Sequence, residues 1–185
     1  MLRLFFALQP AEAQGAGLVE AVAPLVAQLG GQRVPASNLH ATLCFVGAVA
    51  AEKLPLLCAA AARVRGNPAT LDFDALDYWD KPEVIVATSP EAESARDLSA
   101  RLFEQTIAAG FAPDRKPFRP HLTLARKVRR RDAAKISWPR VLEEKVGLRC
   151  DRFVLMESRR GDAGSVYSVV DSWPLDGENG PANIQ

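Results

Sequence analysis

The chain contains a strand–helix–strand pattern that occurs twice, and this duplication most constrains how it can fold. Each copy ends in the same frame, His-x-Thr-Leu, which begins at His40 and again at His121. These are the only two histidines of the 185 residues. From Leu4 to His40 is 36 residues, and from Val84 to His121 is 37. We interpret the nearly equal spacing as an internal duplication of one β-α-β unit.

Apolar periodicity and turn residues give the expected elements of each unit. The first unit is expected to contain a strand at Leu2–Leu8, a helix ending at Gly30, a strand at Leu39–Val46 closed by Gly47, a helix at about Glu52–Val64 and a strand near Thr70–Leu76. The second is expected to contain a strand at Glu83–Thr88, a helix ending at Gly110 and a strand at His121–Arg126. Further strands at about Arg149–Ser158 and Ser165–Asp171 are expected to complete the second sheet.

Two prolines lead to specific expectations about the helices. Pro24 lies inside the first helix, where a proline removes a hydrogen bond and should kink or split it. Ser89 and Pro90 have the sequence of a helix start, with Ser89 as the N-cap and Pro90 in the first helical position.

Strand parity places each histidine beside a threonine. In an extended strand residues i and i+2 face the same side, so His40 lies with Thr42 and His121 with Thr123. The apolar residues between them are expected on the opposite face, in the first copy Leu39, Ala41, Leu43 and Phe45. A pseudo-two-fold relation between the two units would bring both pairs to one cleft.

Two imidazoles and two hydroxyls suit a displacement at phosphorus. One neutral imidazole takes a proton from the attacking oxygen, one imidazolium protonates the leaving oxygen, and hydroxyls donate to the phosphoryl oxygens. A single His-x-Thr strand is usually structural, but two copies that use every histidine favour catalysis. A zinc site is the other alternative, and it is disfavoured because neither frame has a Cys-x-x-Cys or an adjacent carboxylate.

The charge distribution indicates an anionic substrate. The net charge is only +1, which argues against non-specific coating of nucleic acid. Between Arg115 and Arg131, however, there are eight Lys or Arg and no Asp or Glu, and this segment brackets the second histidine. A run such as arginines 129–131 is usually a solvated loop, but its position beside a candidate catalytic residue favours an anionic substrate.

The cysteines and the lengths of the apolar runs indicate the cellular compartment in which the protein is expected. The three cysteines, Cys44, Cys58 and Cys150, are expected to be buried thiols in a reducing cytoplasm. Cys44 could be a nucleophile, but a small apolar strand residue is favoured because the second frame has Ala125 in its place. No apolar run approaches the roughly 20 residues of a membrane helix, and Leu4–Leu8 is interpreted as a buried strand and not as an export signal.

Four segments carry a resemblance to a known family. They are residues 3–8 (RLFFAL), 38–47 (NLHATLCFVG), 117–126 (PFRPHLTLAR) and 167–175, and the two histidine segments are the specific ones. The chain resembles the two-histidine phosphoesterases, and most closely the RNA 2′,3′-cyclic phosphodiesterases, formerly called 2′-5′ RNA ligases. The resemblance implies a bilobed α+β fold, with antiparallel sheets flanking a central cleft and helices outside. It also implies hydrolysis of a terminal 2′,3′-cyclic phosphate to a 2′-phosphomonoester without metal or cofactor.

The resemblance also assigns roles within the site. His40 would be the proton donor and His121 the proton acceptor, with Thr42, Thr123 and Arg126 binding the phosphate. The residues alone do not fix which histidine is acid and which is base. Arg126 has the wrong strand parity for this role unless the strand ends or bulges near Ala125, or its long side chain curls round the edge of the sheet. Aromatic residues stack on the bases of single-stranded RNA ends, and Phe118 is our candidate.

Several alternatives stay open. The same cleft could join RNA ends through a 2′-5′ linkage, or act on small cyclic nucleotides or 2′,5′-oligoadenylates. A non-catalytic RNA-end-binding module is the alternative from another class. We expect a cytoplasmic monomer with one bilobed domain at residues 1–176 and a flexible tail at 177–185, and neither a membrane nor a metal as a partner.

Overall fold

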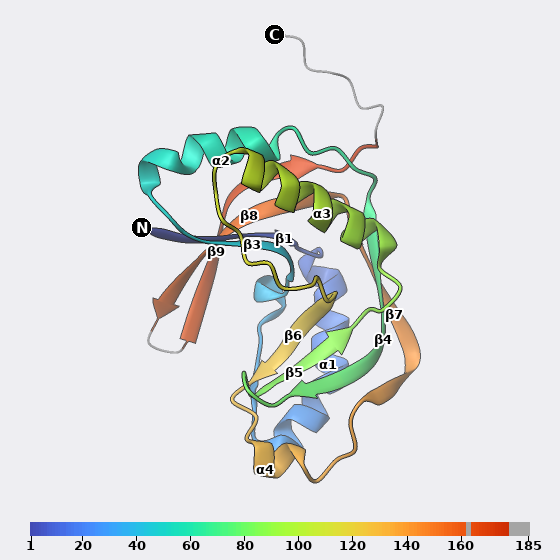
Figure 1. Cartoon of the computed structure of the whole chain (residues 1–185). Coiled ribbons are helices and arrows are strands. Elements are labelled where there is room, and N and C mark those ends of the chain that lie inside the picture. Colours follow the sequence, from blue (N-terminus) through green and yellow to red (C-terminus); the bar gives the residue numbers. More distant parts are fainter. Residues whose placement is uncertain (162–163, 178–185) are drawn as a thin grey trace.

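Two antiparallel sheets form the framework of the protein, shown by a computed structural model that describes residues 1–161 and 164–177 (Figure 1). One sheet has the strand order β3-β1-β8-β9, and the other β2-β6-β5-β4-β7. This is the α+β architecture that the sequence predicted. The strands are β1 (Leu2–Leu8), β2 (Gln32–Arg33), β3 (Ala41–Val49), β4 (Ala69–Trp79), β5 (Val84–Thr88), β6 (His121–Arg126), β7 (Arg140–Cys150), β8 (Arg152–Gly161) and β9 (Gly164–Pro174). The α-helices are α1 (Glu12–Leu29), α2 (Leu54–Ala61), α3 (Glu93–Ala108) and α4 (Arg130–Ala133).

The duplicated unit is visible in the strand pairing. β1 pairs antiparallel with β3 in the four-stranded sheet, and β5 pairs antiparallel with β6 in the five-stranded sheet. His121 is the first residue of β6, whereas His40 directly precedes β3, which begins two residues later than expected. Each histidine therefore enters its sheet at the start of an equivalent strand.

The expected assignment of the other strands to sheets was wrong, because the two units exchange strands. β4 pairs with β5 of the second unit across the short reversal that joins Trp79 to Val84. β8 and β9 pair with each other and with β1 of the first unit. Strands joined by a tight turn pair with each other, wherever the duplication would place them. The single strand expected at Arg149–Ser158 is in fact the end of β7 and most of β8, and the chain changes sheet at Asp151.

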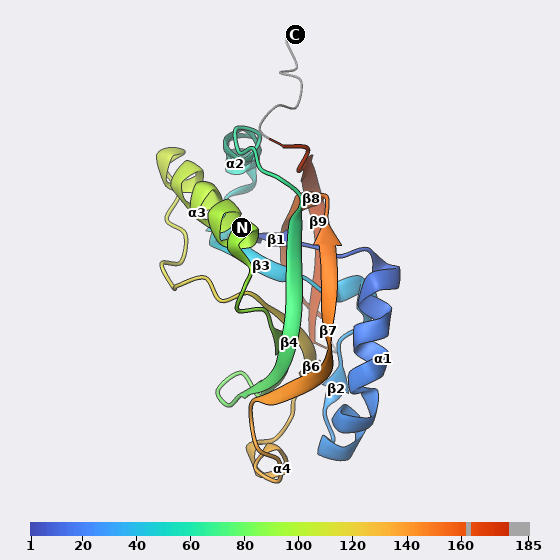
Figure 2. The ribbon, with the colours of Figure 1, turned by 90° about the vertical axis from the view of Figure 1, so that its right-hand side faces the viewer.

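The two long helices also cross between the units. α1 follows β1 in sequence but contacts β2, β6 and β7 of the five-stranded sheet. α3 precedes β6 in sequence but contacts β3 of the four-stranded sheet, as well as β4 and α2. Figure 2 shows α1 and α3 on opposite sides of the molecule. One cluster of buried apolar residues includes side chains from both sheets, so they share a core. None of the helices in the described part of the chain combines the length and apolar character needed to cross a membrane.

The structure tests two expectations about the helices and part of the expected tail. Pro24 does not split α1, which runs continuously; both Pro24 and Glu20 are exposed, so water can solvate the carbonyl that loses its partner. The helix expected at Glu52–Val64 is a 3₁₀ turn (Ala51–Lys53) followed by the shorter α2. Of the expected tail, Gly177 bonds to Gly66 through its backbone N–H, and residues 178–185 lie outside the described residues.

Ser89 does not cap α3, which begins at Glu93 with Ala92 as its N-cap residue. The backbone N–H of Ser89 instead donates to the Pro120 carbonyl at 3.1 Å, which extends the pairing of β5 with the segment before β6. The side chain of Ser89 is fully buried, and its Oγ has no hydrogen-bond partner among the described residues.

The two buried serines beside α3 should therefore differ in their contribution to stability. Ser89→Ala removes an unsatisfied hydroxyl and should leave the free energy of unfolding unchanged or raise it by about 1 kcal/mol. Ser99 donates from Oγ to the Leu43 carbonyl at 2.6 Å, so Ser99→Ala should lower it by about 1–3 kcal/mol. Urea denaturation of both variants measures this difference. Equal destabilisation by the two substitutions would contradict it.

Candidate active site

The two imidazoles are held by the same local hydrogen bond. Nδ1 of His40 lies 2.8 Å from the carbonyl of Asn38, and Nδ1 of His121 lies 2.6 Å from the carbonyl of Arg119. A carbonyl only accepts, so Nδ1 carries the proton in both rings. This tautomer leaves Nε2 of each ring as the nitrogen that accepts or donates a proton.

Aromatic side chains fix the planes of both rings. The His40 ring lies 5.0 Å from the Phe5 ring and 4.7 Å from that of Tyr167, measured between centroids. The His121 ring lies 4.4 Å from the indole of Trp79. The Trp79 Nε1–H donates in turn to a carboxylate oxygen of Asp77 at 3.2 Å. Each imidazole thus has a defined position and orientation before any ligand binds.

Both imidazoles are neutral at pH 7 in this environment. The pKa of His40 is lowered to about 4: burial is the main cause, and electrostatic interaction with Arg126 and His121 acts in the same direction, against the hydrogen bond to Asn38. Burial also lowers the pKa of His121, against the hydrogen bond to Arg119. The electrostatic interaction of His40 with both Arg126 and His121 means that the structure brings these three side chains together from two different sheets.

A β-bulge in β3 changes the parity that the sequence analysis assumed. The pairing skips Leu43, because Cys44 lies opposite Phe6 whereas Thr42 lies opposite Ala7. Leu43 and Cys44 are both buried, and Phe45 returns to the face of Thr42. The expectation that Phe45 packs on the opposite face was therefore wrong.

A second bulge, in β6, resolves the difficulty with Arg126. Ala125 lies opposite Ile85 and Thr123 opposite Val86, so Leu124 is the extra residue. Leu124 and Ala125 are both buried, and Arg126 returns to the face of His121 and Thr123. The bulge that Arg126 required near Ala125 is thus present.

Arg126 is oriented by a residue from the other sheet. Its Nη2 donates to the hydroxyl of Tyr167 on β9 at 3.0 Å, and its guanidinium lies 5.8 Å from the centre of the Tyr167 ring. Tyr167 therefore contacts both Arg126 and His40. The sequence analysis did not single out Tyr167 as a site residue, since nothing in its local sequence shows that β9 lies beside the first histidine.

Two pockets meet between the histidines. The larger, about 770 Å³, includes His121, and the smaller, about 430 Å³, includes His40 and Arg126. Thr42 and Phe45 line both pockets, so they mark the junction. Thr123 is half-buried and is not among the described residues that line either pocket.

The larger pocket has an apolar and aromatic lining. Phe118, our candidate for base stacking, lines it, as do Trp79 and Phe103. The segment before β6 closes one side, where the Asp114 N–H donates to the Phe45 carbonyl at 2.9 Å. Phe118 and Trp79 thus both lie where a base next to the histidines could stack.

The basic segment divides into two parts with different surroundings. Arg115, Lys116 and Arg119 line the larger pocket, and Arg126 lines the smaller one. The arginines 129–131 lie in neither lining; they belong to the turn at α4, where Arg130 pairs with Asp80 at 3.2 Å.

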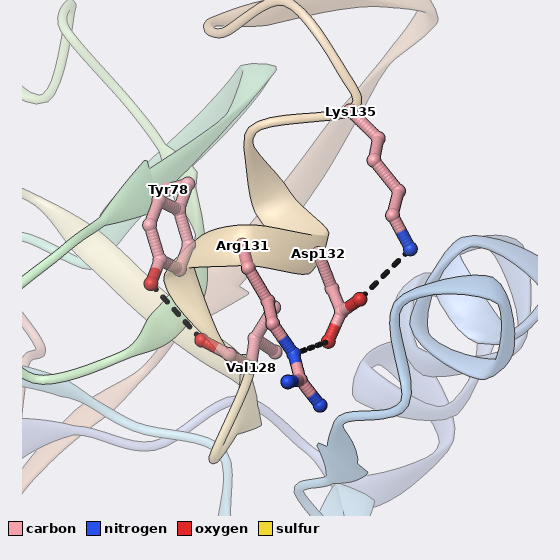
Figure 3. Close-up of polar contacts among 5 residues, drawn as sticks. All are labelled: Tyr78, Val128, Arg131, Asp132 and Lys135. Atoms are coloured by element: carbon pink, nitrogen blue, oxygen red, sulfur yellow. Dashed lines mark hydrogen bonds and ion pairs between the residues drawn. The ribbon is translucent and has the colours of Figure 1, made fainter.

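The α4 turn is held by its own polar contacts. Asp132 accepts from Lys135 at 2.8 Å and lies 3.8 Å from Arg131, and Tyr78 donates to the Val128 carbonyl at 3.0 Å (Figure 3). The ammonium of Lys135 accordingly lowers the pKa of Asp132. This end of the segment is a solvated loop, and only the part before and within β6 contributes charge to the pockets.

Cys44 has the environment of a packing residue. Burial raises its pKa to about 11, so at pH 7 it is a thiol and a weak nucleophile. Cys150 is also buried, whereas Cys58 is only half-buried, contrary to expectation. Within residues 1–161 and 164–177, no three His, Cys, Asp or Glu side chains cluster in a way that could hold a metal ion.

Comparisons with known proteins place this geometry in a family. The family model of the 2′-5′ RNA ligase superfamily matches residues 10–162. The RNA 2′,3′-cyclic phosphodiesterase of Escherichia coli (strain K12) is 34% identical over 126 residues, covering 67% of this chain and 71% of that protein. The protein of the same name from Thermus thermophilus is 32% identical over 197 residues, covering 100% and 96%.

Solved structures agree with the fold. A phosphoesterase crystal structure has a TM-score of 0.82 at 27% identity, covering 95% of this chain and 98% of that chain. E. coli LigT complexed with 3′-AMP has a TM-score of 0.80 at 27% identity, covering 94% and 98%. The fold is thus that of the bilobed α+β phosphoesterases. The chain belongs to the 2′-5′ RNA ligase superfamily, which confirms the resemblance found in its sequence.

The charge on Arg126 should add to the effect of burial on the pKa of His40. In the free protein the Cε1 proton of His40 should titrate at about pH 4, and Arg126→Gln should shift this pKa upward because a nearby cation disfavours the imidazolium. Proton–carbon NMR measures the titration, and His121→Asn assigns the two signals. Arg131→Gln, at α4, is the control and should leave the titration unchanged. A titration of His40 near 6.5, or no shift in Arg126→Gln, would contradict this.

Proposed function

We propose that this chain hydrolyses the 2′,3′-cyclic phosphate at RNA 3′ ends to a 2′-phosphomonoester. The observation that supports the proposal is the junction of the two pockets: Thr42 lines both, His121 lines the larger, and His40 and Arg126 line the smaller. The names of the E. coli and T. thermophilus relatives, RNA 2′,3′-cyclic phosphodiesterase, support the same reaction.

In the proposed mechanism the two imidazoles act on opposite sides of phosphorus. His121 accepts a proton from water at Nε2 as the water oxygen attacks phosphorus in line with the 3′ oxygen. The bond between phosphorus and the 3′ oxygen breaks, and the His40 imidazolium donates its Nε2 proton to that oxygen. Each proton transfer contributes roughly 10²–10⁴-fold to the rate. Thr42, Thr123 and Arg126 stabilise the negative charge that builds on the non-bridging oxygens.

The depressed pKa of His40 makes its charge depend on the substrate. His40 has to be protonated to act as the acid, yet in the free protein its pKa is about 4. A bound phosphate adds a negative charge beside the imidazole and pairs with Arg126, and both changes raise the pKa of His40. The acid thus forms in the presence of the substrate and not before.

The proposal also covers the cofactor requirement, the compartment, the oligomeric state and the substrate range. We propose that the reaction needs no metal or cofactor, since the two imidazoles supply both proton transfers. We also propose a cytoplasmic monomer, with the three free cysteines consistent with a reducing compartment. Small cyclic nucleotides and 2′,5′-oligoadenylates would fit the same chemistry. Ligation of RNA ends into a 2′-5′ linkage would use the same groups in reverse.

Hydrolysis in the presence of EDTA tests the proposal. An oligoribonucleotide that ends in 2′,3′-cyclic phosphate should be converted to the 2′-phosphate, and His40→Ala and His121→Ala should each lower kcat by about 10²–10⁴-fold. Product isomers are resolved by chromatography, and Arg131→Gln, far from the pockets, serves as the active control. Full activity in either histidine variant would refute the acid–base pair. Turnover only after metal addition would refute metal independence. Binding of the RNA end by the wild-type protein without any turnover would favour the non-catalytic binding module.

Replacing the 3′ oxygen of the substrate by sulfur separates the roles of the histidines. A thiolate is a far better leaving group than an alkoxide and needs little help from an acid. The loss of kcat in His40→Ala should therefore shrink strongly with the 3′-thio substrate, whereas the loss in His121→Ala should persist. The opposite pattern would exchange the two assignments.

A further inference from the structure

The face of the four-stranded sheet that carries His40 and Thr42 continues beyond them. On β1, Arg3 and Phe5 have the same parity, and Phe5 lies opposite Phe45 of β3 and Met156 of β8. Ser158 and Arg160 continue the Met156 face along β8. On β9 their direct partners are Tyr167 and Ser165. One face thus runs from an aromatic centre to a polar end.

This polar end forms the outer part of the smaller pocket. The lining of about 430 Å³ includes Arg3, Ser158, Arg160 and Ser165 in addition to the groups around His40. Among the described residues that line this pocket there is no Asp or Glu. Glu157, which precedes Ser158 in the sequence, has the opposite parity and pairs with Arg159 at 2.7 Å. Among the described residues of this lining, the formally charged side chains are therefore all arginines.

The two outer arginines both lie toward the polar end of this face, on the neighbouring strands β1 and β8. The guanidinium of Arg3 lies 4.8 Å from the centre of the Phe45 ring, which holds it over the face. Arg160 reaches the pocket from β8, two strands away from β3. The same lining therefore contains two guanidinium groups and two serine hydroxyls, which are donors that bind a phosphate group.

The larger pocket does not have this character. Its lining is mostly apolar and aromatic, and its basic side chains are accompanied by Glu104 and by Asp114, which pairs with Lys116 at 3.0 Å. A nucleoside suits this lining, because bases stack on aromatic rings. The two pockets that meet at Thr42 thus favour different parts of a nucleotide.

We propose that Arg3 and Arg160, with Ser158 and Ser165, form a second phosphate subsite that binds a phosphate ester other than the one that reacts. The ligand class is a nucleotide with two separate phosphate groups. The second group is either a terminal 5′-phosphate or an internucleotide phosphate of RNA. This inference rests on the proposed function, because it takes the junction beside His40 as the place of the reacting phosphate.

Direct binding tests the subsite without turnover. Isothermal titration calorimetry compares adenosine 2′-monophosphate with adenosine 2′,5′-bisphosphate. The bisphosphate should bind about tenfold more tightly or better, and Arg3→Gln/Arg160→Gln should remove this advantage. Arg129→Gln/Arg131→Gln loses the same charge at α4 and should keep it. No advantage in the wild type, or an advantage that survives Arg3→Gln/Arg160→Gln, would overturn the subsite. Loss of the advantage in Arg115→Gln/Lys116→Gln instead would place the phosphate in the larger pocket and also overturn it.

Turnover identifies the source of the second phosphate. The substrates are adenosine 2′,3′-cyclic phosphate, its 5′-phosphorylated form, and a diadenylate ending in cyclic phosphate. An advantage in kcat/KM for the second substrate that depends on Arg3 and Arg160 assigns the subsite to a terminal phosphate. An advantage for the diadenylate alone assigns it to an internucleotide phosphate. Equal kcat/KM for all three would overturn it. No turnover of any substrate, with the calorimetric advantage intact, would refute the proposed function and leave the subsite standing.

Discussion

The site depends on two β-bulges, each held by the other unit of the duplicated fold. The bulge at Leu43 leaves a carbonyl outside the strand ladder, and Ser99 of α3 donates to it. The bulge at Leu124 leaves a carbonyl that accepts from the Val34 N–H at 2.8 Å. An unpaired buried carbonyl is costly, so each bulge is stable only where the opposite unit supplies a donor. Because the bulges reset parity, Phe45 and Arg126 face the histidines.

Burial and the nearby positive charge of Arg126 together determine the protonation of the two histidines in the free site. Two imidazoles and an arginine share a desolvated space, and this arrangement disfavours further positive charge there. The free site therefore holds neutral imidazoles, with the Nδ1 protons bound to backbone carbonyls and Nε2 available. An anion removes the electrostatic penalty on protonation. In the proposed mechanism this arrangement favours an anionic ligand, and the arginines that line the smaller pocket add positive charge beside it.

Elements determined by local sequence were predicted correctly, whereas features fixed by long-range pairing were not. The strand His121–Arg126 was predicted with its bounds, since a β-strand alternation bounded by proline and a basic turn is a local signal. The exchange of β4 with β8 and β9 was missed, because an internal duplication says nothing about which sheet a later hairpin joins. The N-cap at Ser89 was wrong for a similar reason. Its backbone N–H is used by Pro120, a residue 31 positions away that no local rule considers.

The sequence by itself determined the chemistry of this protein and its duplicated plan. His40, Thr42, His121 and Thr123 are readable from spacing and strand parity, because both are properties of short segments. Only the tertiary structure decided that Arg126 faces the site, that Tyr167 orients it, and that Arg3 and Arg160 flank one pocket. Each of these depends on a register shift or a strand order, and both are fixed by long-range hydrogen bonding and by the core that the two sheets share.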